Sequence, residues 1–410
     1  MQEHGTPADE LLADLDERRG RDPDVHGARL FGLTYPTGRD DLEHLVHEVY
    51  SRYLFGNALN PFKFVELAAL EADVLADVGA LVNLSTRDRG GGGGGTMTSG
   101  GTESILMSMF VNRERARARG IERPRIVAAV SAHPAYAKAA HYFDMDLVQY
   151  PIDAGFRADV AAASELVDDR TAVIVASAFS YPHGVMDPVA DLAALAAQHG
   201  VGCHVDACIG SFVLPFLERL GHDVPPWDFR VEGVTEMSAD IHKYGFVPKG
   251  ASVVLHRDED WFGHQVFLYD RWPSGIYGSP AMAGARAAAP IATAWAVLRY
   301  LGVEGYSQIQ GDLAATTAKV RSAIETAAGV EVVGDPIGPV LAMQSDEIDL
   351  YAVGDVMDDR GWNLNRNTEP RGLHLMLSPA HGGVVDELVG DLADALAHHG
   401  ESRGVEARYS

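Results

Sequence analysis

Apolar positions recur along the chain with two different periods, and the change between them predicts where helices and strands lie. Near the N-terminus the spacing is three to four residues, which predicts helices over 40–53 and 61–82. Further along, short apolar runs alternate with helical patterns. They predict strands over 125–130, 146–150, 171–176 and 202–207, separated by helices over 136–142, 158–167 and 187–199. This alternation predicts an α/β fold with a mostly parallel sheet and helices on both of its faces.

The rest of the chain mixes both patterns. We expect a strand over 250–256, a tight loop over 274–280, and two helices, one ending at 301 and one spanning 311–327. Shorter strand and helix signals follow and predict a small α/β domain. The expected organisation is an N-terminal arm and helix (1–60), a large domain (61–305) and a small C-terminal domain (306–410).

Composition and charge narrow the classes of function. With 410 residues and 47% hydrophobic content, the chain is long enough for a large buried core. Its net charge of -25 argues against nucleic acid or an anionic membrane as a partner. The two cysteines, Cys203 and Cys208, suggest neither a disulfide framework nor a metal site, so we expect a reducing, cytoplasmic location. The polar segment 1–22 does not resemble a signal peptide, and no apolar run predicts an integral membrane segment.

The stretch 237–250 contains the most reactive combination of residues. Lys243 lies beside His242 and five residues after the hydroxyl of Ser238. A lysine amine that is partly shielded from water loses its proton more readily and can attack a carbonyl. This setting therefore suits a Schiff base with pyridoxal 5'-phosphate (PLP). The alternative is an ordinary solvated His-Lys pair at a turn, and only the neighbouring motifs distinguish the two interpretations.

A second motif, 96–104, lies at the start of a predicted helix. Free backbone amides at a helix N-terminus bind anions, and the small residues of 99–102 add two hydroxyls there. The alternative is an ordinary helix cap, in which Glu103 completes a capping box. The glycine run 90–95 before this motif is interpreted as a flexible connector and not as a dinucleotide fingerprint, because no strand leads into it.

Three polar residues lie at the carboxyl ends of predicted strands: His133, Ser177 and Asp206. In a parallel sheet such positions meet at one edge, where ligands bind. Asp206 can pair with a protonated pyridine nitrogen, which makes the ring an electron sink, or it can form a structural salt bridge. His133 can stack on a planar ring or be an ordinary hydrogen-bonded polar residue. Anion site, stacking residue, aspartate and Lys243 follow one another in the order that pyridoxal enzymes of the aspartate-aminotransferase fold require.

Together these motifs resemble those of the sphingosine-1-phosphate lyases, within the group II pyridoxal-dependent decarboxylase superfamily. The matching runs extend over nearly the whole chain and are 98–107, 131–133, 181–184, 204–208, 238–245 and 361–365. The resemblance implies the PLP-dependent transferase fold (fold type I), with a mostly parallel seven-stranded sheet and a small α/β C-terminal domain. It also implies a homodimer whose active site is shared between the subunits.

The resemblance assigns a role to each candidate residue. The implied catalytic residues are Lys243 as the Schiff-base lysine, His133 stacking on the ring, and Tyr35 on the substrate-side loop. The implied cofactor-binding residues are Ser99, Gly100, Gly101, Thr102, His133, Ser177, Asp206, Ser238, His242 and Lys243, with Gly278 and Ser279 reaching in from the partner subunit. The implied substrate-binding residues are Tyr35, Asn60, Phe179, Arg286, and Lys249 near the substrate phosphate.

The departures from the family pattern lie on the substrate side. Asn60 replaces a usual histidine, Phe179 replaces a usual proline, and alanines flank Arg286 where serine and proline are usual. We expect a PLP-dependent carbon-carbon lyase that cleaves a phosphorylated 2-amino-3-hydroxy, sphingoid-like substrate by a retro-aldol reaction, giving an aldehyde and phosphoethanolamine. The alternatives are an amino acid decarboxylase, for which Arg286 or Arg366 offers a cation, and a catalytically degenerate binding protein that keeps the fold.

Overall fold

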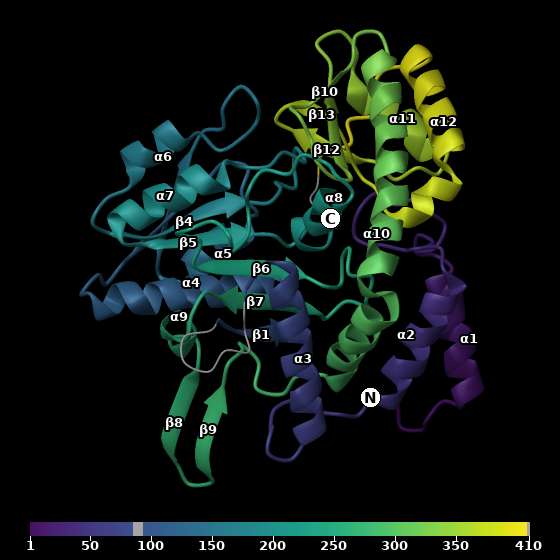
Figure 1. The fold of residues 1–410 in the computed structure, drawn as a ribbon. Coiled ribbons are helices and arrows are strands. Elements are labelled where there is room, and N and C mark those ends of the chain that lie inside the picture. Colours follow the sequence, from purple (N-terminus) through teal and green to yellow (C-terminus); the bar gives the residue numbers. More distant parts are fainter. Residues whose placement is uncertain (85–92, 408–410) are drawn as a thin grey trace.

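A seven-stranded sheet forms the centre of the molecule (Figure 1). The computed structural model describes residues 1–84 and 93–407. The strand order is β1-β7-β6-β5-β4-β2-β3. Among these described strands, β7 alone runs in the direction opposite to the other six. The bounds are β1 (Gly94–Thr98), β2 (Arg125–Ala129), β3 (Asp146–Tyr150), β4 (Thr171–Ser177), β5 (Gly202–Asp206), β6 (Glu236–Asp240) and β7 (Ser252–His256). The prediction of a mostly parallel seven-stranded sheet is confirmed.

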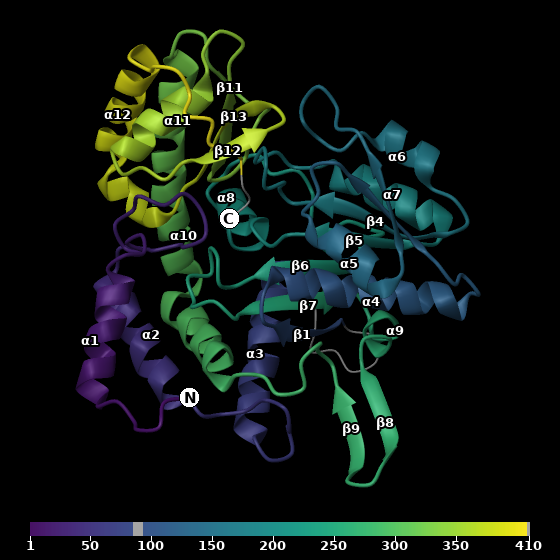
Figure 2. The ribbon, with the colours of Figure 1, turned by 180° about the vertical axis from the view of Figure 1, so that it is seen from behind.

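Helices pack on both faces of this sheet. The helices that precede α10 are α1 (Ala8–Arg19), α2 (Asp40–Arg52), α3 (Val65–Leu81), α4 (Gly101–Ala118), α5 (Ala135–Phe143), α6 (Val160–Leu166), α7 (Val189–His199), α8 (Leu214–Arg219) and α9 (Glu259–Gly263). Of these, α1 and α2 lie away from the sheet (Figure 1 and Figure 2). Side chains of the central strands alternate between two cores. Ile126 and Val173 join the core beneath α4 and α5, whereas Val127 and Ile174 join the core beneath α6 and α7. Figure 2 shows these two pairs of helices on either side of β4 and β5. Within the residues that the structure describes, no helix is long and apolar enough to cross a membrane.

The C-terminal part joins the sheet through one long helix, α10 (Ala288–Thr326). Beyond it lies a four-stranded antiparallel sheet in the order β10-β11-β13-β12, with α11 packed on β13 and α12 on α11. The bounds are β10 (Glu331–Val332), β11 (Val340–Gln344), α11 (Leu350–Asp359), β12 (Asn365–Thr368), β13 (Arg371–Met376) and α12 (Val385–Ala397). The expected small α/β domain is therefore present, and the predicted boundary between residues 305 and 306 falls inside α10.

The expectation of two helices is confirmed in part, because α10 consists of two helical segments that meet at a kink at Gly302. Only Gly302 leaves the helical range within it, at φ 55° and ψ -173°. The apolar stripe continues through the segment between the two predicted helices, because the Tyr306 ring stacks on Phe216 at 5.2 Å and on Phe246 at 6.0 Å. The first helical segment therefore ends at the predicted residue 301, whereas the second begins earlier than the predicted residue 311.

Two expected loops are strands. The segment 274–280 belongs to a hairpin formed by β8 (Phe267–Trp272) and β9 (Gly275–Ser279), which projects away from the sheet (Figure 1). Gly94 and Gly95, expected in a connector, begin β1. A Cβ at Gly95 would lie 2.6 Å from the Val254 carbonyl oxygen of β7, so this close pairing requires glycine. Residues 90–92 of the predicted connector lie outside the described residues.

Candidate active site

The predicted lysine lies in a cavity at the carboxyl edge of the sheet. The volume of the cavity is about 330 Å³. Ser177, Asp206 and Asp240 end the strands β4, β5 and β6, and parallel pairing brings β4, β5 and β6 to the same edge. The predicted residues that line this cavity are Ser99, Gly100, Gly101, Thr102, His133, Ser177, Phe179, Asp206, His242 and Lys243. Segments far apart in the sequence therefore form one site.

A buried carboxylate holds the Lys243 ammonium. Lys243 Nζ lies 3.0 Å from Asp240 Oδ2, and the Asp240 side chain is only 2% exposed. Burial opposes a charged amine, but the carboxylate outweighs it, so the pKa of Lys243 lies well above its ordinary value. Burial also opposes the carboxylate, yet the adjacent Lys243 ammonium outweighs it and holds the pKa of Asp240 below its usual range. The unmodified Lys243 is therefore half of a buried ion pair.

Asp206 is fixed in place by hydrogen bonds from its neighbours. Its Oδ1 accepts from the Cys208 amide at 3.0 Å and from Ser238 Oγ at 3.4 Å. The structure places Ser238 behind Asp206, where its hydroxyl also lies 3.2 Å from His204 Nε2, and not among the residues that line the cavity. An anchored carboxylate at the cavity wall is suited to hold a protonated ring nitrogen.

The first turn of α4 forms an anion site. Gly100 is its N-cap residue, and within residues 93–407 no side chain caps this helix. The first amides of α4 therefore remain available for a phosphate. A Cβ at Gly101 would lie 2.7 Å from Cys208 Sγ, so glycine allows the close approach of this turn to β5. The expected capping interaction is shifted, because Glu103 accepts a hydrogen bond from the Ser99 amide at 2.7 Å.

Two histidines face the cavity in their neutral form. Burial lowers the pKa of His242 to about 4, and its Nδ1 has no hydrogen-bond partner among the described residues. Burial also lowers the pKa of His133, whose Nδ1 accepts a hydrogen bond from the Ala135 amide at 3.1 Å. The unsatisfied nitrogen of His242 and the open helix terminus fit the phosphate of PLP, while Asp206 and His133 fit its ring.

Tyr35 and Lys249 lie together next to this cavity. Lys249 Nζ lies 4.6 Å from the centre of the Tyr35 ring and donates to the His242 carbonyl oxygen at 3.4 Å. Loss of hydration and the like charge of Lys243 lower the pKa of Lys249 to about 8. In the part of the chain that the structure describes, Lys249 forms no ion pair with a carboxylate. A cation is thus in position for an anionic group of a ligand.

Four predicted residues line a different cavity, of about 290 Å³: Asn60, Gly278, Ser279 and Arg286. Glu71 binds Arg286 through two contacts, of 2.5 Å and 2.9 Å, and so neutralises the guanidinium. Asn60 Oδ1 accepts a hydrogen bond from the Lys63 amide at 3.1 Å and stabilises a turn before α3. Within one chain, the structure does not bring these four residues to Lys243.

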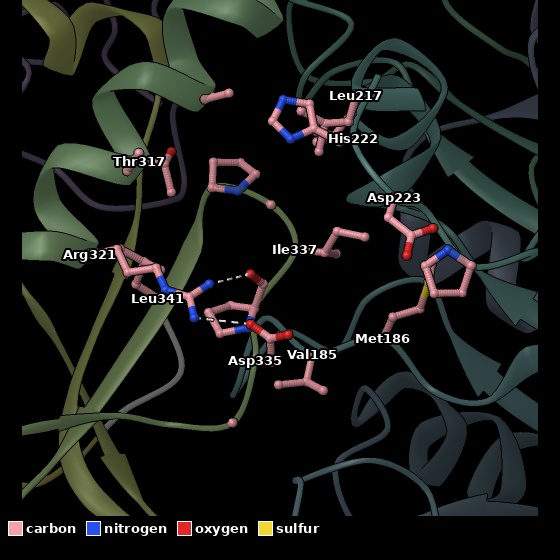
Figure 3. Close-up of a pocket in the computed structure, with 18 of the residues that line it drawn as sticks. Val185, Met186, Leu217, His222, Asp223, Thr317, Arg321, Asp335, Ile337 and Leu341 are labelled. Carbon is pink, nitrogen blue, oxygen red and sulfur yellow. Dashed lines mark hydrogen bonds and ion pairs between the residues drawn. The ribbon is translucent and has the colours of Figure 1, made fainter. Parts of the chain in front are cut away.

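A larger cavity, of about 680 Å³, lies between the large and small domains (Figure 3). Its walls are mainly apolar, with Leu217 on one side and Ile337 and Leu341 on the other. Arg321 projects from α10 and donates to Asp335 at 3.0 Å. None of the predicted site residues lines the described walls of this cavity, so its size does not mark the predicted site.

Asp240, Cys208 and Tyr181 also line the Lys243 cavity, and they were not predicted as site residues. The signal available for Asp240 was its position three residues before Lys243, within the matching run 238–245. Cys208 and Tyr181 occur in the matching runs, but only the folded chain shows that they line the same cavity as Lys243. Asp240, the carboxylate partner of Lys243, is therefore a functional residue that was not predicted from the sequence.

Comparison with known proteins agrees with this geometry. Residues 43–344 match the pyridoxal-dependent decarboxylase conserved domain. The chain belongs to this family. PLP is therefore its cofactor, and the protein is a PLP-dependent lyase. The start of α4 and His242 would hold the phosphate of PLP, and Asp206 and His133 would contact its ring.

Similarity to individual relatives extends beyond the domain. The chain is 38% identical to a sphingosine-1-phosphate lyase of Oryza sativa subsp. japonica, over 95% of this chain and 72% of the relative. It is 38% identical to sphingosine-1-phosphate lyase 1 of Mus musculus, over 91% of this chain and 65% of the relative. A solved sphingosine-1-phosphate lyase of Burkholderia pseudomallei has a TM-score of 0.93 and 37% identity, covering 97% of this chain and 92% of that chain. The predicted resemblance and the fold type I architecture are both confirmed.

Proposed function

We propose that this enzyme cleaves the bond between C2 and C3 of a phosphorylated 2-amino-3-hydroxy, sphingoid-like substrate and releases an aldehyde and phosphoethanolamine. The observation that carries the proposal is Lys249, a cation beside the Lys243 cavity that has no carboxylate partner in the described chain. An ammonium in this position suits a substrate phosphate. The relatives named sphingosine-1-phosphate lyase support the same substrate class.

Different residues of the cavity would hold different parts of PLP. PLP, when bound, withdraws electrons from the substrate bond that breaks. Lys243 Nζ would join it covalently, and Asp206 would keep a proton on its ring nitrogen. His133 would cover the ring, while the α4 terminus and His242 would hold the phosphate. The protein thereby fixes the ring against the sheet edge.

Two side chains are placed to move protons. Retro-aldol cleavage needs a base for the substrate hydroxyl, and the carbon released from the bond must then receive a proton. We assign the first task to Tyr35, whose hydroxyl contacts Met376 Sδ at 3.3 Å and whose ring lies beside Lys249. We assign the second to Lys243, because its ammonium is kept protonated by Asp240.

The decarboxylase alternative needs a free cation beside a substrate carboxylate. Arg286 is bound by Glu71 through both of its terminal nitrogens. Arg366 is bound by Asp355 and Asp358, each at 2.8 Å, in the small domain. Neither candidate arginine is available to a substrate at Lys243, which supports the lyase reaction over decarboxylation.

The test of this proposal compares products from three substrate classes. PLP-loaded enzyme is incubated with a phosphorylated sphingoid base, with its dephosphorylated counterpart and with a set of amino acids. We expect equal amounts of aldehyde and phosphoethanolamine from the first substrate, and at least about tenfold less product from the second, since a charged contact is lost. Carbon dioxide without aldehyde would refute the lyase proposal. PLP bound without turnover of any candidate would identify a degenerate binding protein, and Lys243→Ala is the matched inactive control.

We also propose a homodimer with a shared active site. The projecting hairpin β8–β9 exposes large apolar side chains, namely Phe267, Leu268, Trp272 and Ile276, at 52 to 77% exposure. Such a surface is typical of a subunit interface. Gly278 and Ser279 lie on β9, so a partner subunit docked on the hairpin can receive them at its own cavity.

Mixing two inactive variants tests the shared site. Lys243→Ala removes the lysine, and Ser279→Asp places a negative charge where we expect the partner's phosphate. Hybrid dimers would contain one intact site, so we expect the mixture to regain part of the activity that each variant lacks alone. A monomeric mass by sedimentation, or no recovery in a mixture shown to exchange subunits, would contradict the shared site.

A further inference from the structure

Asp240 is built into the rigid part of the site. It is the last residue of β6, and its backbone pairs with Ser252 of the antiparallel strand β7. Oδ2 lies 3.0 Å from Lys243 Nζ and 3.6 Å from His242 Nε2. Oδ1 is buried and has no hydrogen-bond partner within residues 1–84 and 93–407. The carboxylate therefore depends on Lys243 for a cationic partner.

Burial explains why the Asp240 carboxylate needs the Lys243 ammonium in particular. A buried carboxylate is unfavourable unless a cation compensates it. His242 does not supply the charge, because burial lowers its pKa to about 4. Glycine at position 101 leaves room for this carboxylate, because the Cβ of any other residue there would lie 2.8 Å from Asp240 Oδ2. Asp206, in contrast, already accepts hydrogen bonds from residues that follow or neighbour β5.

We propose that Asp240 is a positioning residue for Lys243, which receives its ammonium whenever the lysine nitrogen is not bonded to PLP. Lys243 must leave PLP when a substrate amine takes its place, and it must return when the product departs. A charged contact at 3.0 Å keeps the released amine protonated and inside the cavity during that interval. The inference rests on Lys243 carrying PLP and is independent of which substrate is cleaved.

Other ionisable groups also face Lys243, from several elements. They are His133 after β2, Asp206 and Cys208 at the end of β5, His242 and Lys249 on the loop of Lys243, and Tyr35 from the N-terminal segment. Burial lowers the pKa of both histidines and raises the pKa of the thiol, so these three groups are neutral. Lys249 carries the wrong charge to hold an ammonium. Asp206 is the other carboxylate in this set and provides a matched control.

The first measurement needs no variant. PLP-free enzyme is treated with acetic anhydride over a series of pH values, and peptide mass spectrometry gives the acetylated fraction of each lysine. We expect Lys249 to react with a midpoint near pH 8, and Lys243 to react only above the ordinary pKa of lysine, because Asp240 holds its proton. A midpoint for Lys243 at or below that of Lys249 would overturn the proposal.

The second measurement removes the charge of Asp240 while keeping its shape. In PLP-free Asp240→Asn, we expect the acetylation midpoint of Lys243 to fall by at least about one pH unit, since a buried amine without a carboxylate has a lowered pKa. Asp206→Asn should shift the midpoint far less. Because only the neutral amine attacks PLP, we also expect the rate at which PLP rejoins Lys243, followed by stopped-flow absorbance, to rise at a lower pH in Asp240→Asn than in the wild type. An unchanged midpoint, or an equal shift in both variants, would refute a specific role for Asp240.

Discussion

The cavity at Lys243 and the cavity at Arg321 differ in what their charged groups are bonded to. The Arg321 cavity is the larger, about 680 Å³ against about 330 Å³. Its guanidinium is bonded to Glu325 and Asp335, and both carboxylates are exposed to solvent. At Lys243 the carboxylate is buried, and Asp240 Oδ1 and His242 Nδ1 have no partner in the described part of the chain.

The comparison shows that the larger cavity is not the one with buried polar groups that need a ligand. Ion pairs between solvent-exposed groups contribute little to the free energy of folding, and they leave no group in need of a ligand. Buried polar atoms without partners are unfavourable, so they mark places where a ligand completes the hydrogen bonding. The smaller cavity is therefore the reactive one, and substitutions in the two cavities should have unequal effects on activity.

The largest effect is expected from Lys243→Ala. Removal of the nitrogen that carries PLP should lower kcat/KM by at least about 10³-fold, the scale on which loss of a covalent catalytic group acts. The absorbance band of lysine-bound PLP should disappear as well. Steady-state kinetics and an absorbance spectrum check both expectations, and residual activity within tenfold of the wild type would show that the chemistry lies elsewhere.

Asp206→Asn should have the next largest effect. The amide cannot stabilise a protonated ring nitrogen, so the ring withdraws electrons less well, and we expect kcat to fall by about 10²- to 10³-fold. PLP should still bind, because the α4 terminus and Lys243 are unchanged. Measurement of kcat together with bound PLP per chain distinguishes this result from simple loss of cofactor, which would contradict the assigned role.

Lys249→Met should act mainly on KM for a phosphorylated substrate. Loss of a charged hydrogen bond corresponds to a rise in KM of about 10- to 100-fold, with a smaller change in kcat. Because the pKa of Lys249 is about 8, its cation is present below that pH and is lost as the pH rises through it. The wild-type kcat/KM should therefore decline above about pH 8, and a decline of equal size in Lys249→Met would count against this assignment.

Arg321→Ala should have the smallest effect, despite its position in the larger cavity. We expect activity within about twofold of the wild type, and a loss of about 1 kcal/mol or less in the free energy of unfolding, because its ion pairs are solvent-exposed. Chemical denaturation and the product assay check the two quantities. A severe loss of activity would mean that the comparison between the cavities is wrong.

Most of the central sheet could be predicted from the sequence, for a physical reason. Strands β2, β4 and β5 are buried on both faces, so they appear as short apolar runs between helices. The strands that were not predicted lack that signal. All six residues of β8 are exposed, and β1 begins in glycines that pack closely against β7. Neither gives an apolar run or a clear alternation.

The candidate site divides in a similar way. Lys243, Asp206 and His133 could be predicted because each lies in a local motif at the end of a strand. Interactions between distant segments could not be predicted. Glu71 neutralises Arg286 across 215 positions of sequence, and this pairing depends on how α3 lies against the segment before α10. The role of Asp240 also needed coordinates, because only they show that its carboxylate is buried against the lysine.

The central claim is that Lys243 carries PLP, and chemical trapping tests it most directly. The PLP-loaded enzyme is reduced with sodium borohydride and digested, and peptide mass spectrometry locates the pyridoxyl group. The other lysines of the chain are Lys63, Lys138, Lys249 and Lys319. We predict a stoichiometric adduct on Lys243 and none on these four. An adduct on another lysine of the wild-type protein, or no adduct at all, would contradict the account.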